Sequence, residues 1–369
     1  MIESKRPIEF TDDQQKLLDS ISPTRIILPI LIGLAVIAFI IKGQLDFDEI
    51  HYINWDVHVL FWIGVAIVVY IIRHLLIAWR LRLLSEYEFS WKKSIELVFI
   101  LEFASAVSPT NFGGSAVAFF MLIQETISGA RATAIVVYTI VADTIIFVIT
   151  IPVLALLIGM NAFRPELDLT SHFDGLGTTL LIVWVIMTIY GLLFLYGLFI
   201  KPKHLKRLLN VFASWKIFGK SRERIRKAAA DIEITALSIS EKSWSFHGHA
   251  AWMTFAQWIC RFFSITAILI AFSPELQADI MDHIILLSRG EALYAVTAYS
   301  PTPGGSGVAE LIFSRFYSDY IDQNAALLGA IFWRVITYYP YLFLGIIIIP
   351  NWIRTLINRR RLLKTSSQM

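Results

Sequence analysis

Five ionisable residues lie inside stretches of this chain that are otherwise apolar: Glu102, Asp143, Arg261, Glu310 and Arg334. Ionisable side chains at membrane depth are energetically expensive, and they usually face a cavity, a partner or a substrate. Carboxylates and guanidinium groups in such surroundings can hold an anionic or zwitterionic head group, or carry a proton. They can equally form ion pairs that only stabilise the fold. The positions of these residues indicate which of the two roles applies.

A second chemical signal is a motif that occurs twice. Residues 108–118 read Ser-Pro-Thr-Asn-Phe-Gly-Gly-Ser-Ala-Val-Ala, and residues 300–309 read Ser-Pro-Thr-Pro-Gly-Gly-Ser-Gly-Val-Ala. Proline interrupts a helix, and two glycines allow another backbone or a ligand to approach closely. Ordinary turns would share these residues, but broken helices at corresponding places in two halves of a chain are typical of a transport site.

The predicted substrate-binding residues come from these two motifs and the nearby charges. They are Ser108, Pro109, Thr110, Gly113, Gly114, Asp143, Arg261, Ser300, Pro301, Thr302, Gly304, Gly305, Glu310 and Arg334. The helix starts expected at 113–117 and 305–309 would offer free N–H groups to an anion. The sequence contains no motif of a known catalytic or metal site, so we expect no catalytic residue, metal or cofactor.

The spacing of the motifs relates two of the charges. Gly114 and Gly305 are 191 positions apart, and the same offset relates Asp143 to Arg334. Opposite charges at equivalent positions predict either an ion pair between the halves or a charged site at their interface. For Arg261 the alternatives are an interfacial position and pairing with Glu310 or a phosphate.

Glu310 directly follows the second motif, whereas Phe119 is its equivalent in the first half. A carboxylate that the repeat does not require favours a functional role, so Glu310→Gln is expected to remove transport while leaving the fold intact. Arg73, His74 and Arg80 lie near one end of a predicted span, and we interpret them as interfacial anchors.

Composition places the chain in a membrane. Of its 369 residues, 56% are hydrophobic and only 17% are charged, which is typical of a polytopic membrane protein rather than a soluble domain. We expect no nucleic-acid partner. The polar first 23 residues show no signal peptide, so the first apolar segment is expected to remain as a span. Cys260 is the only cysteine, which excludes an intrachain disulfide.

The predicted fold is an all-α polytopic membrane protein. A span needs about 20 mostly apolar residues, and six segments qualify: 25–43, 57–79, 132–160, 177–200, 249–272 and 325–350. Segments 92–123 and 280–317 carry the motifs at their centres, with arms such as 292–299 that are too short to cross a bilayer. We therefore expect two re-entrant hairpins.

Basic residues predict the orientation. Segment 201–248 holds eleven Lys and Arg against four acids, so it should face the cytoplasm together with both termini, in the plasma (inner) membrane. Acidic segments 44–56, 161–175 and 273–282 should face the other side. These sides are consistent only if both motif segments are hairpins, which makes an inverted-topology repeat. The predicted organisation is a cytoplasmic segment 1–24, a transmembrane domain 25–350 with repeats 57–160 and 249–350, and a basic tail 351–369.

The two motifs, followed by Asp143 in one span and Arg334 in the last, resemble the transmembrane region of lysylphosphatidylglycerol synthases, a flippase-like family. The resemblance covers about residues 20–350. It implies an inner-membrane protein that binds or translocates phospholipid. Because only about 20 residues follow the last predicted span, we expect the cytosolic synthase domain of that family to be missing, and its aminoacyl transfer is not implied.

The leading interpretation is a non-enzymatic phospholipid flippase. One alternative is a secondary transporter of a small anionic or zwitterionic solute, with Glu310 or Asp143 as a proton site. Another is a membrane enzyme that acts on lipid head groups. Segment 201–248 and the tail are expected to contact an anionic membrane surface, and the oligomeric state stays open.

Overall fold

The computed structural model describes only part of the chain. The chain divides into two units, Met1–Leu45 and Asp46–Met369, and every described residue belongs to the second. The predicted span 25–43 and most of segment 201–248 lie outside the described residues. Those described are 55–108, 112–125, 127–163, 175–196, 203–204, 207, 239, 241–273, 276, 279–298, 300, 302–305, 308–317, 319–321 and 323–366.

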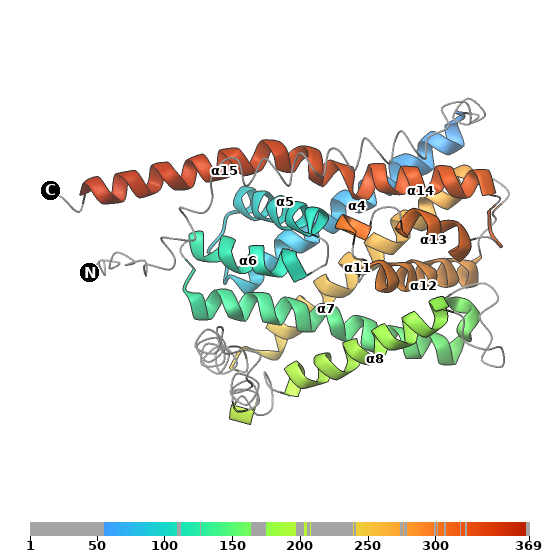
Figure 1. The fold of residues 1–369 in the computed structure, drawn as a ribbon, viewed down its shortest axis with the longest axis horizontal. Coiled ribbons are helices and arrows are strands. Elements are labelled where there is room, and N and C mark those ends of the chain that lie inside the picture. Colours follow the sequence, from blue (N-terminus) through green and yellow to red (C-terminus); the bar gives the residue numbers. More distant parts are fainter. Residues whose placement is uncertain are drawn as a thin grey trace. The chain divides into compact units, whose positions relative to one another are not determined.

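The described residues form helices and contain no strand, which confirms the all-α prediction for this part of the chain (Figure 1). In order, the helices are α4 (Val57–Leu84), α5 (Trp91–Val107), α6 (Phe112–Gln124), α7 (Gly129–Leu157), η1 (Met160–Ala162), α8 (Gly175–Leu195), α11 (Trp244–Phe272), α12 (Ile280–Thr297), η4 (Pro303–Gly305), α13 (Val308–Phe316), α14 (Gln323–Thr337) and α15 (Tyr339–Ser366).

Polar caps set where the longer helices begin. Five helices start after an Asp or Ser whose side chain accepts a hydrogen bond from the first turn: Asp56, Ser90, Ser128, Ser243 and Asp279. Such a cap satisfies a backbone N–H that has no partner within the helix. The side chain of Asp282 also accepts from the Asp279 N–H, completing a capping box at the start of α12.

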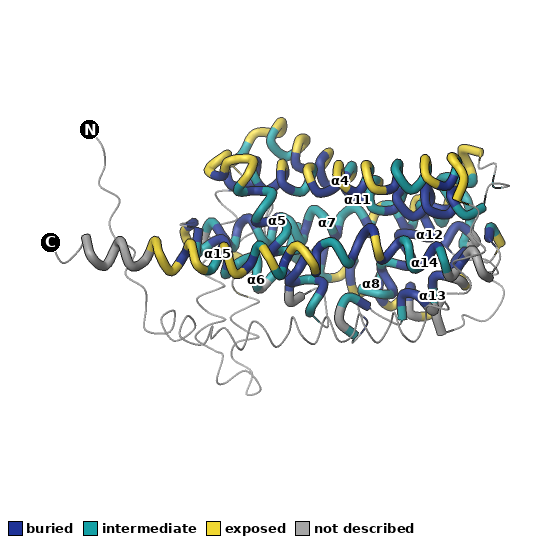
Figure 2. The backbone as a smooth tube through the Cα atoms, turned by 90° about the horizontal axis from the view of Figure 1, so that it is seen from above, coloured by how far each residue is buried: buried dark blue, intermediate teal, exposed yellow. Residues whose placement is uncertain are grey.

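Four helices among the described residues are long and apolar enough to cross a membrane. They are Val57–Leu84 (α4), Arg131–Leu157 (within α7), Trp244–Phe272 (α11) and Leu328–Arg359, a segment that runs through α14 and α15. They correspond to four of the six predicted spans, and the predicted span 177–200 appears as a shorter apolar helix, Leu180–Leu195. Exposed positions follow the outer side of α4 (Figure 2), where large apolar side chains such as Phe61 and Ile71 would meet lipid.

Helices α4 and α11 form the most extensive helix–helix contact in the described structure. His58 near the start of α4 donates from Nε2 to the carbonyl oxygen of Ile270 near the end of α11, over 3.0 Å. Arg80 near the end of α4 donates to Thr254 Oγ1 near the start of α11, also over 3.0 Å. These two contacts show that the helices run antiparallel.

Two pairs of short helices flank α4 and α11, with α5 and α6 in one pair and α12 and α13 in the other (Figure 1). Each pair surrounds one copy of the motif. The order of neighbours is also the same in both halves. Helices α4, α5, α6 and α7 pack in sequence, as do α11, α12, α13 and α14.

The structure differs from the predicted segments in two places. Helix α12 has 18 residues, so the arm before the second motif is longer than expected, because the helix continues through the charged residues Arg289 and Glu291. The predicted span 325–350 is divided at Tyr338 into α14 and α15, and α15 continues to Ser366 into the predicted tail. Pro340 lacks a backbone N–H, which accounts for the break.

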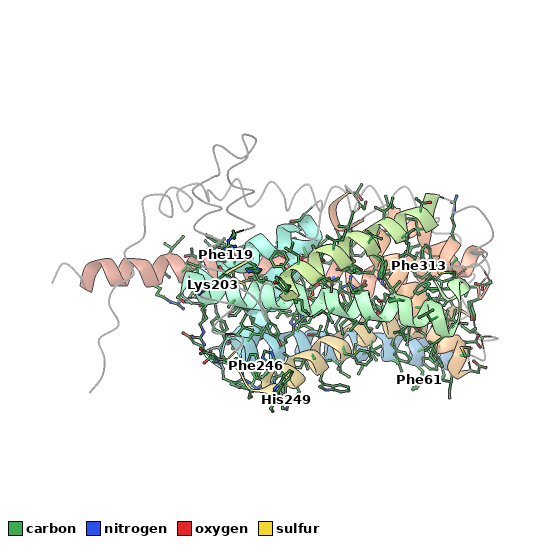
Figure 3. All side chains as sticks on the ribbon, turned by 90° about the horizontal axis from the view of Figure 1, so that it is seen from below. Phe61, Phe119, Lys203, Phe246, His249 and Phe313 are labelled. Atoms are coloured by element: carbon green, nitrogen blue, oxygen red, sulfur yellow. The ribbon has the colours of Figure 1, made fainter. Side chains whose placement is uncertain are left out.

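The core is apolar and lies between the helices of the two halves. Phe147 of α7, Phe262 of α11 and Phe313 of α13 are buried in one cluster. Figure 3 labels Phe313, which is fully buried, and Phe61, which is exposed. Apolar side chains therefore occupy two environments, the packed interior and an exposed surface that suits contact with lipid.

Candidate functional site

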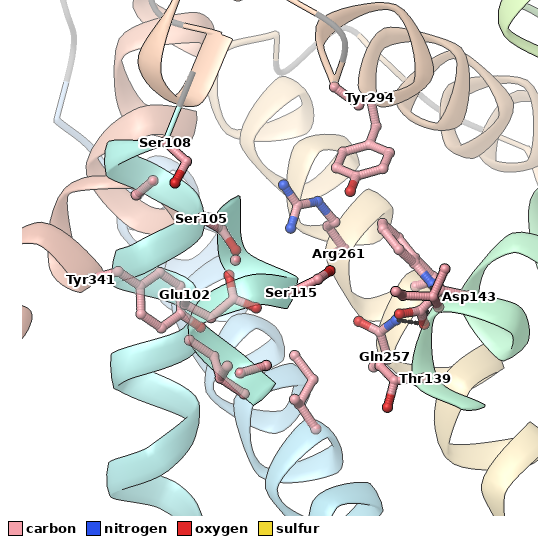
Figure 4. Close-up of a pocket in the computed structure, with 18 of the residues that line it drawn as sticks. Glu102, Ser105, Ser108, Ser115, Thr139, Asp143, Gln257, Arg261, Tyr294 and Tyr341 are labelled. Carbon is pink, nitrogen blue, oxygen red and sulfur yellow. Dashed lines mark hydrogen bonds between the residues drawn. The ribbon is translucent and has the colours of Figure 1, made fainter. Parts of the chain in front are cut away.

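A cavity of about 370 Å³ lies among the helices and is lined by residues of both halves. Figure 4 shows its centre, where Arg261 reaches in from α11 and Asp143 lies on α7. Most of the predicted site residues line this cavity: Ser108, Gly114, Asp143, Arg261, Ser300, Thr302, Gly304, Gly305 and Arg334. Sequence positions far apart are therefore brought to one place by the fold.

Five predicted residues are not placed on the cavity wall. Pro109, Thr110 and Pro301 lie outside the described residues, and Gly113 belongs to α6 without its surroundings being described. Glu310 is described but is not among the lining residues; it reaches the cavity through its partner Arg334.

The two motifs meet at the cavity. The N–H of Gly304 donates to the carbonyl oxygen of Ser108 over 3.4 Å, so a backbone group of the second motif contacts the first motif directly. Gly304 has φ +58, and a Cβ built there would overlap the Tyr338 ring. The hydroxyl of Tyr338 donates in turn to the carbonyl oxygen of Ala106 over 3.0 Å. Glycine at 304 is therefore required by conformation and by space.

Asp143 is bound by Arg80 rather than by Arg334. Its Oδ1 lies 2.6 Å from Arg80 Nη1, and Trp258 Nε1 donates to the same oxygen over 3.1 Å. No ion pair between Asp143 and Arg334 occurs among the described residues, so the ion-pair alternative was wrong, although both residues line the cavity. The reason is that α4 packs along α11 and brings the Arg80 guanidinium to α7, which no repeat offset reveals.

Arg334 is paired with Glu310. Its Nε donates to Glu310 Oε1 over 2.7 Å, and its Nη1 donates to the carbonyl oxygen of Gly304 over 2.9 Å. Both side chains are buried. Glu310 thus holds Arg334, which links α14 to the second motif. The sequence-based interpretation that the fold does not need the Glu310 carboxylate was therefore wrong.

A third ion pair joins α4 to α5. Arg73 Nη2 lies 2.8 Å from Glu102 Oε1, and Arg73 Nη1 donates to the hydroxyls of Tyr70 and Tyr341 over 3.3 Å. Arg73, His74 and Arg80 are all buried. The interpretation of these three residues as interfacial anchors was therefore wrong, because their polar groups find partners inside the bundle.

Arg261 is the exception among the cavity arginines. In the described part of the chain its guanidinium makes no ion pair and no hydrogen bond. It lies over the rings of Tyr294 and Trp258, with its Cζ 4.7 and 5.6 Å from their centroids. Among the described residues Arg261 does not pair with Glu310, which was one of its alternatives, because Glu310 is engaged by Arg334. Aromatic faces attract the cation, but they leave its five N–H donors available to an anion.

Hydroxyl groups surround this guanidinium on the side of the motifs. Ser105 and Ser115 lie on α5 and α6 and point toward the cavity (Figure 4). A Cβ added at Gly114 would overlap Ser105 Oγ, so the glycine allows α6 to approach α5 closely. Serine hydroxyls and a guanidinium together can hold a phosphate or carboxylate.

Several lining residues were missing from the predicted site, namely Tyr70, Arg73, Arg80, Glu102, Ser105, Ser115, Gln257, Trp258, Tyr294 and Tyr341. One signal could have found two of them. Arg73 and Arg80 are seven positions apart, which places both on the same side of a helix two turns apart. The aromatic residues carry no such signal, because aromatic residues are also common at membrane interfaces.

Comparison with known proteins relates the chain to membrane proteins. No solved structure matches the chain significantly. A protein of Archaeoglobus fulgidus, named UPF0104 membrane protein, is 23% identical over 336 residues, which cover 86% of this chain and 94% of the relative. The model of the family described as the lysylphosphatidylglycerol synthase transmembrane region matches residues 26–345. This chain therefore belongs to the lysylphosphatidylglycerol synthase transmembrane region family of membrane proteins.

Proposed function

We propose that this protein binds the phosphate-bearing head group of a phospholipid in the cavity and moves the lipid between the two leaflets. The observation that carries the proposal is the charge balance of the site. Three arginines are each matched by a carboxylate, in the pairs Arg73–Glu102, Arg80–Asp143 and Arg334–Glu310. Arg261 remains without an anionic partner in the described structure.

An unmatched cation in such surroundings favours an anionic ligand. Desolvating a charge is costly unless it is paired, and a guanidinium binds a phosphate in a bidentate, planar arrangement that a lysine cannot reproduce. Arg261 also lies near hydroxyls of the first motif (Figure 4). A lipid phosphate would complete the pairing that the protein leaves open.

The proposed path follows from the two motif pairs. Helices α5, α6 and α13 have 17, 13 and 9 residues, fewer than the roughly 20 that a span requires. We infer that each pair enters the membrane and returns, as an inverted repeat with the cavity between the pairs. The equal order of neighbours in the two halves and the antiparallel packing of α4 and α11 support this arrangement.

Orientation, location and the absence of enzymatic activity belong to the same proposal. The excess of basic residues in 201–248 supports a cytoplasmic position for that segment and for both termini, in the plasma membrane and against its anionic lipids. Glu102, Asp143 and Glu310 are each engaged by an arginine, which supports a role of these carboxylates in binding rather than in acid–base chemistry. We therefore propose a transporter and not an enzyme.

The test uses Arg261. Purified protein is reconstituted with a fluorescent phosphatidylglycerol, and the fraction of label accessible to an external quencher is followed with time. We expect Arg261→Gln to lose translocation and Arg261→Lys to retain only part of it, because the lysine lacks the planar fork. Arg354→Gln, on an exposed position of α15, is the matched control and should translocate at the wild-type rate. Equal rates for Arg261→Gln and wild type would refute the proposed role.

The volume of the cavity supports testing one alternative, transport of a small solute, beside the lipid. A cavity of about 370 Å³ also fits a small solute. Vesicles loaded with a radiolabelled small organic anion therefore accompany the lipid assay. Arg261-dependent flux of the anion, without movement of the fluorescent lipid, would replace the lipid proposal with a secondary transporter.

A further inference from the structure

A buried carboxylate outside the cavity wall has no cation to match it. Glu291 of α12 is only 4% exposed, and among the described residues its carboxyl makes one hydrogen bond, with the hydroxyl of Thr150 on α7. In the described part of the chain it forms no ion pair. An ionised carboxylate in this position would be uncompensated in a low dielectric, which is strongly unfavourable.

The arginines and carboxylates on the elements that pack against α12 are engaged elsewhere or lie at the surface. Asp143 of α7 binds Arg80, Arg261 of α11 lies over Trp258 and Tyr294, and Glu310 of α13 binds Arg334. On α12 itself, Arg289 binds Asp319, Asp282 accepts from the Tyr320 hydroxyl, and His283 lies about two helical turns before Glu291. Arg131 of α7 pairs with Glu88, and Arg315 of α13 is exposed. The described residues of α8 and η1 carry no charged side chain.

The number of hydroxyl hydrogens on Thr150 indicates whether the Glu291 carboxyl is protonated in this contact. The Thr150 hydroxyl donates to the carbonyl oxygen of Ile146 over 2.7 Å, and a threonine has only one hydroxyl hydrogen. Both contacts of Thr150 are therefore satisfied only when the Glu291 carboxyl is protonated and donates to Thr150 Oγ1. Thr144, two turns earlier, has the same arrangement with a phenol, since it contacts the carbonyl oxygen of Ile140 and the hydroxyl of Tyr190.

The contact lies next to the transport cavity. Phe147 of α7 and Tyr294 of α12 line the cavity, and Thr150 and Glu291 are each three residues, about one helical turn, away from them. On the orientation proposed above, this turn is on the outward side of the cavity.

We propose that Glu291 is a proton-binding site whose release of the proton is coupled to transport through the cavity. The coupling part rests on the proposed function. In the protonated form the carboxyl O–H donates to Thr150. When the proton passes to water, the carboxylate can only accept from Thr150, which must then abandon Ile146. The buried carboxylate also lacks a cation, so it is stable only after α12 moves relative to α7 and water reaches it.

The first experiment tests protonation without requiring transport. A hydrophobic carbodiimide reacts with a buried protonated carboxyl. The carboxyl oxygen bonds to the central carbon, the proton moves to a nitrogen, and rearrangement leaves a stable N-acylurea. We expect mass spectrometry to find Glu291 modified, with labelling that falls as the pH is raised, while the ion-paired Glu102, Glu125 and Glu310 stay unmodified. An unmodified Glu291 in folded protein would overturn the proposal.

The second experiment tests coupling. The substitution Glu291→Gln imitates the protonated acid, because the new amide can donate to Thr150, so this variant should remain monodisperse with an unchanged unfolding midpoint. A large loss of stability would overturn the proposal. In proteoliposomes the wild-type rate should respond to an imposed pH gradient and the rate of Glu291→Gln should not. Glu125→Gln, which alters a buried carboxylate bound by Lys93 away from the cavity wall, should respond as wild type does.

The outcomes separate the two proposals. A pH-gradient response that Glu291→Gln retains would overturn the coupling even if the residue is labelled. Labelling of Glu291 in a wild-type protein that moves no lipid would contradict the lipid proposal and support the proton-binding site.

Discussion

The ion pair between Arg80 and Asp143 provides a quantitative test. The repeat offset relates Asp143 to Arg334, whereas the structure pairs Asp143 with Arg80. The perturbation is Asp143→Asn, which keeps the size of the side chain and removes its charge. Arg80 is buried, with a side chain 6% exposed, while the Asp143 side chain is 26% exposed toward the cavity. After the change, the Arg80 guanidinium keeps Thr254 as a hydrogen-bond partner but has no anion.

Removing one partner of a buried ion pair typically lowers the free energy of unfolding by about 3–5 kcal/mol. We expect about 3 kcal/mol here, because the partial exposure of Asp143 allows water to solvate the remaining charge. Arg80→Gln should cost about 2 kcal/mol, since Asp143 still accepts from Trp258 and Gln257 and hydrogen bonds to a charged group contribute roughly 1.5–3 kcal/mol. The double variant should cost less than the sum.

The assay is equilibrium unfolding in mixed micelles, with the free energy of unfolding measured for both single variants and the double variant. We expect a coupling energy of about 1–3 kcal/mol between Arg80 and Asp143. The matched control is the cycle between Asp143 and Arg334, whose coupling should stay below about 0.5 kcal/mol because the two share no direct contact in the structure. The exchange Asp143→Arg with Arg334→Asp should likewise recover no stability. A larger coupling for Asp143 with Arg334 than with Arg80 would refute the reasoning.

Three further predictions concern the motifs and the topology. Glu310→Gln should lower the free energy of unfolding by about 3–5 kcal/mol, because it leaves the buried Arg334 without an anion; normal stability with transport lost would restore Glu310 as a purely functional residue. Gly304→Ala should destabilise by about 1–3 kcal/mol through its clash with Tyr338 and its positive φ, whereas Gly64→Ala, where nothing lies near the added Cβ, should not destabilise the protein; thermal unfolding in detergent compares the two. On a Cys260→Ser background, single cysteines should label from the cytoplasm at 124–131 and 201–248 and from outside at 161–175 and 318–324; outside labelling of 124–131 would remove the inverted repeat.

The sequence alone predicted the helical membrane class and the places where helices break. Inside a membrane, every backbone N–H and C=O group of a long apolar segment must be hydrogen-bonded within the protein. A single segment achieves this only as a helix. Proline and paired glycine act on their own backbone, so both interruptions appear near their motifs, between α5 and α6 and between α12 and α13. The two motifs and the nearby charges also supplied most of the expected residues that meet at one cavity.

The partners of the charged residues were decided only by the tertiary structure. An offset of 191 positions relates Asp143 to Arg334, but a salt bridge depends on distances of a few ångströms between side chains on different helices. Those distances depend on how α4 and α7 each pack against α11, which places Arg80 of α4 beside Asp143 of α7. Helical periodicity specifies which face of a helix a residue occupies, and not which neighbour that face meets. For the same physical reason, the unmatched Arg261 and the contact between Glu291 and Thr150 emerge only when the helices are packed.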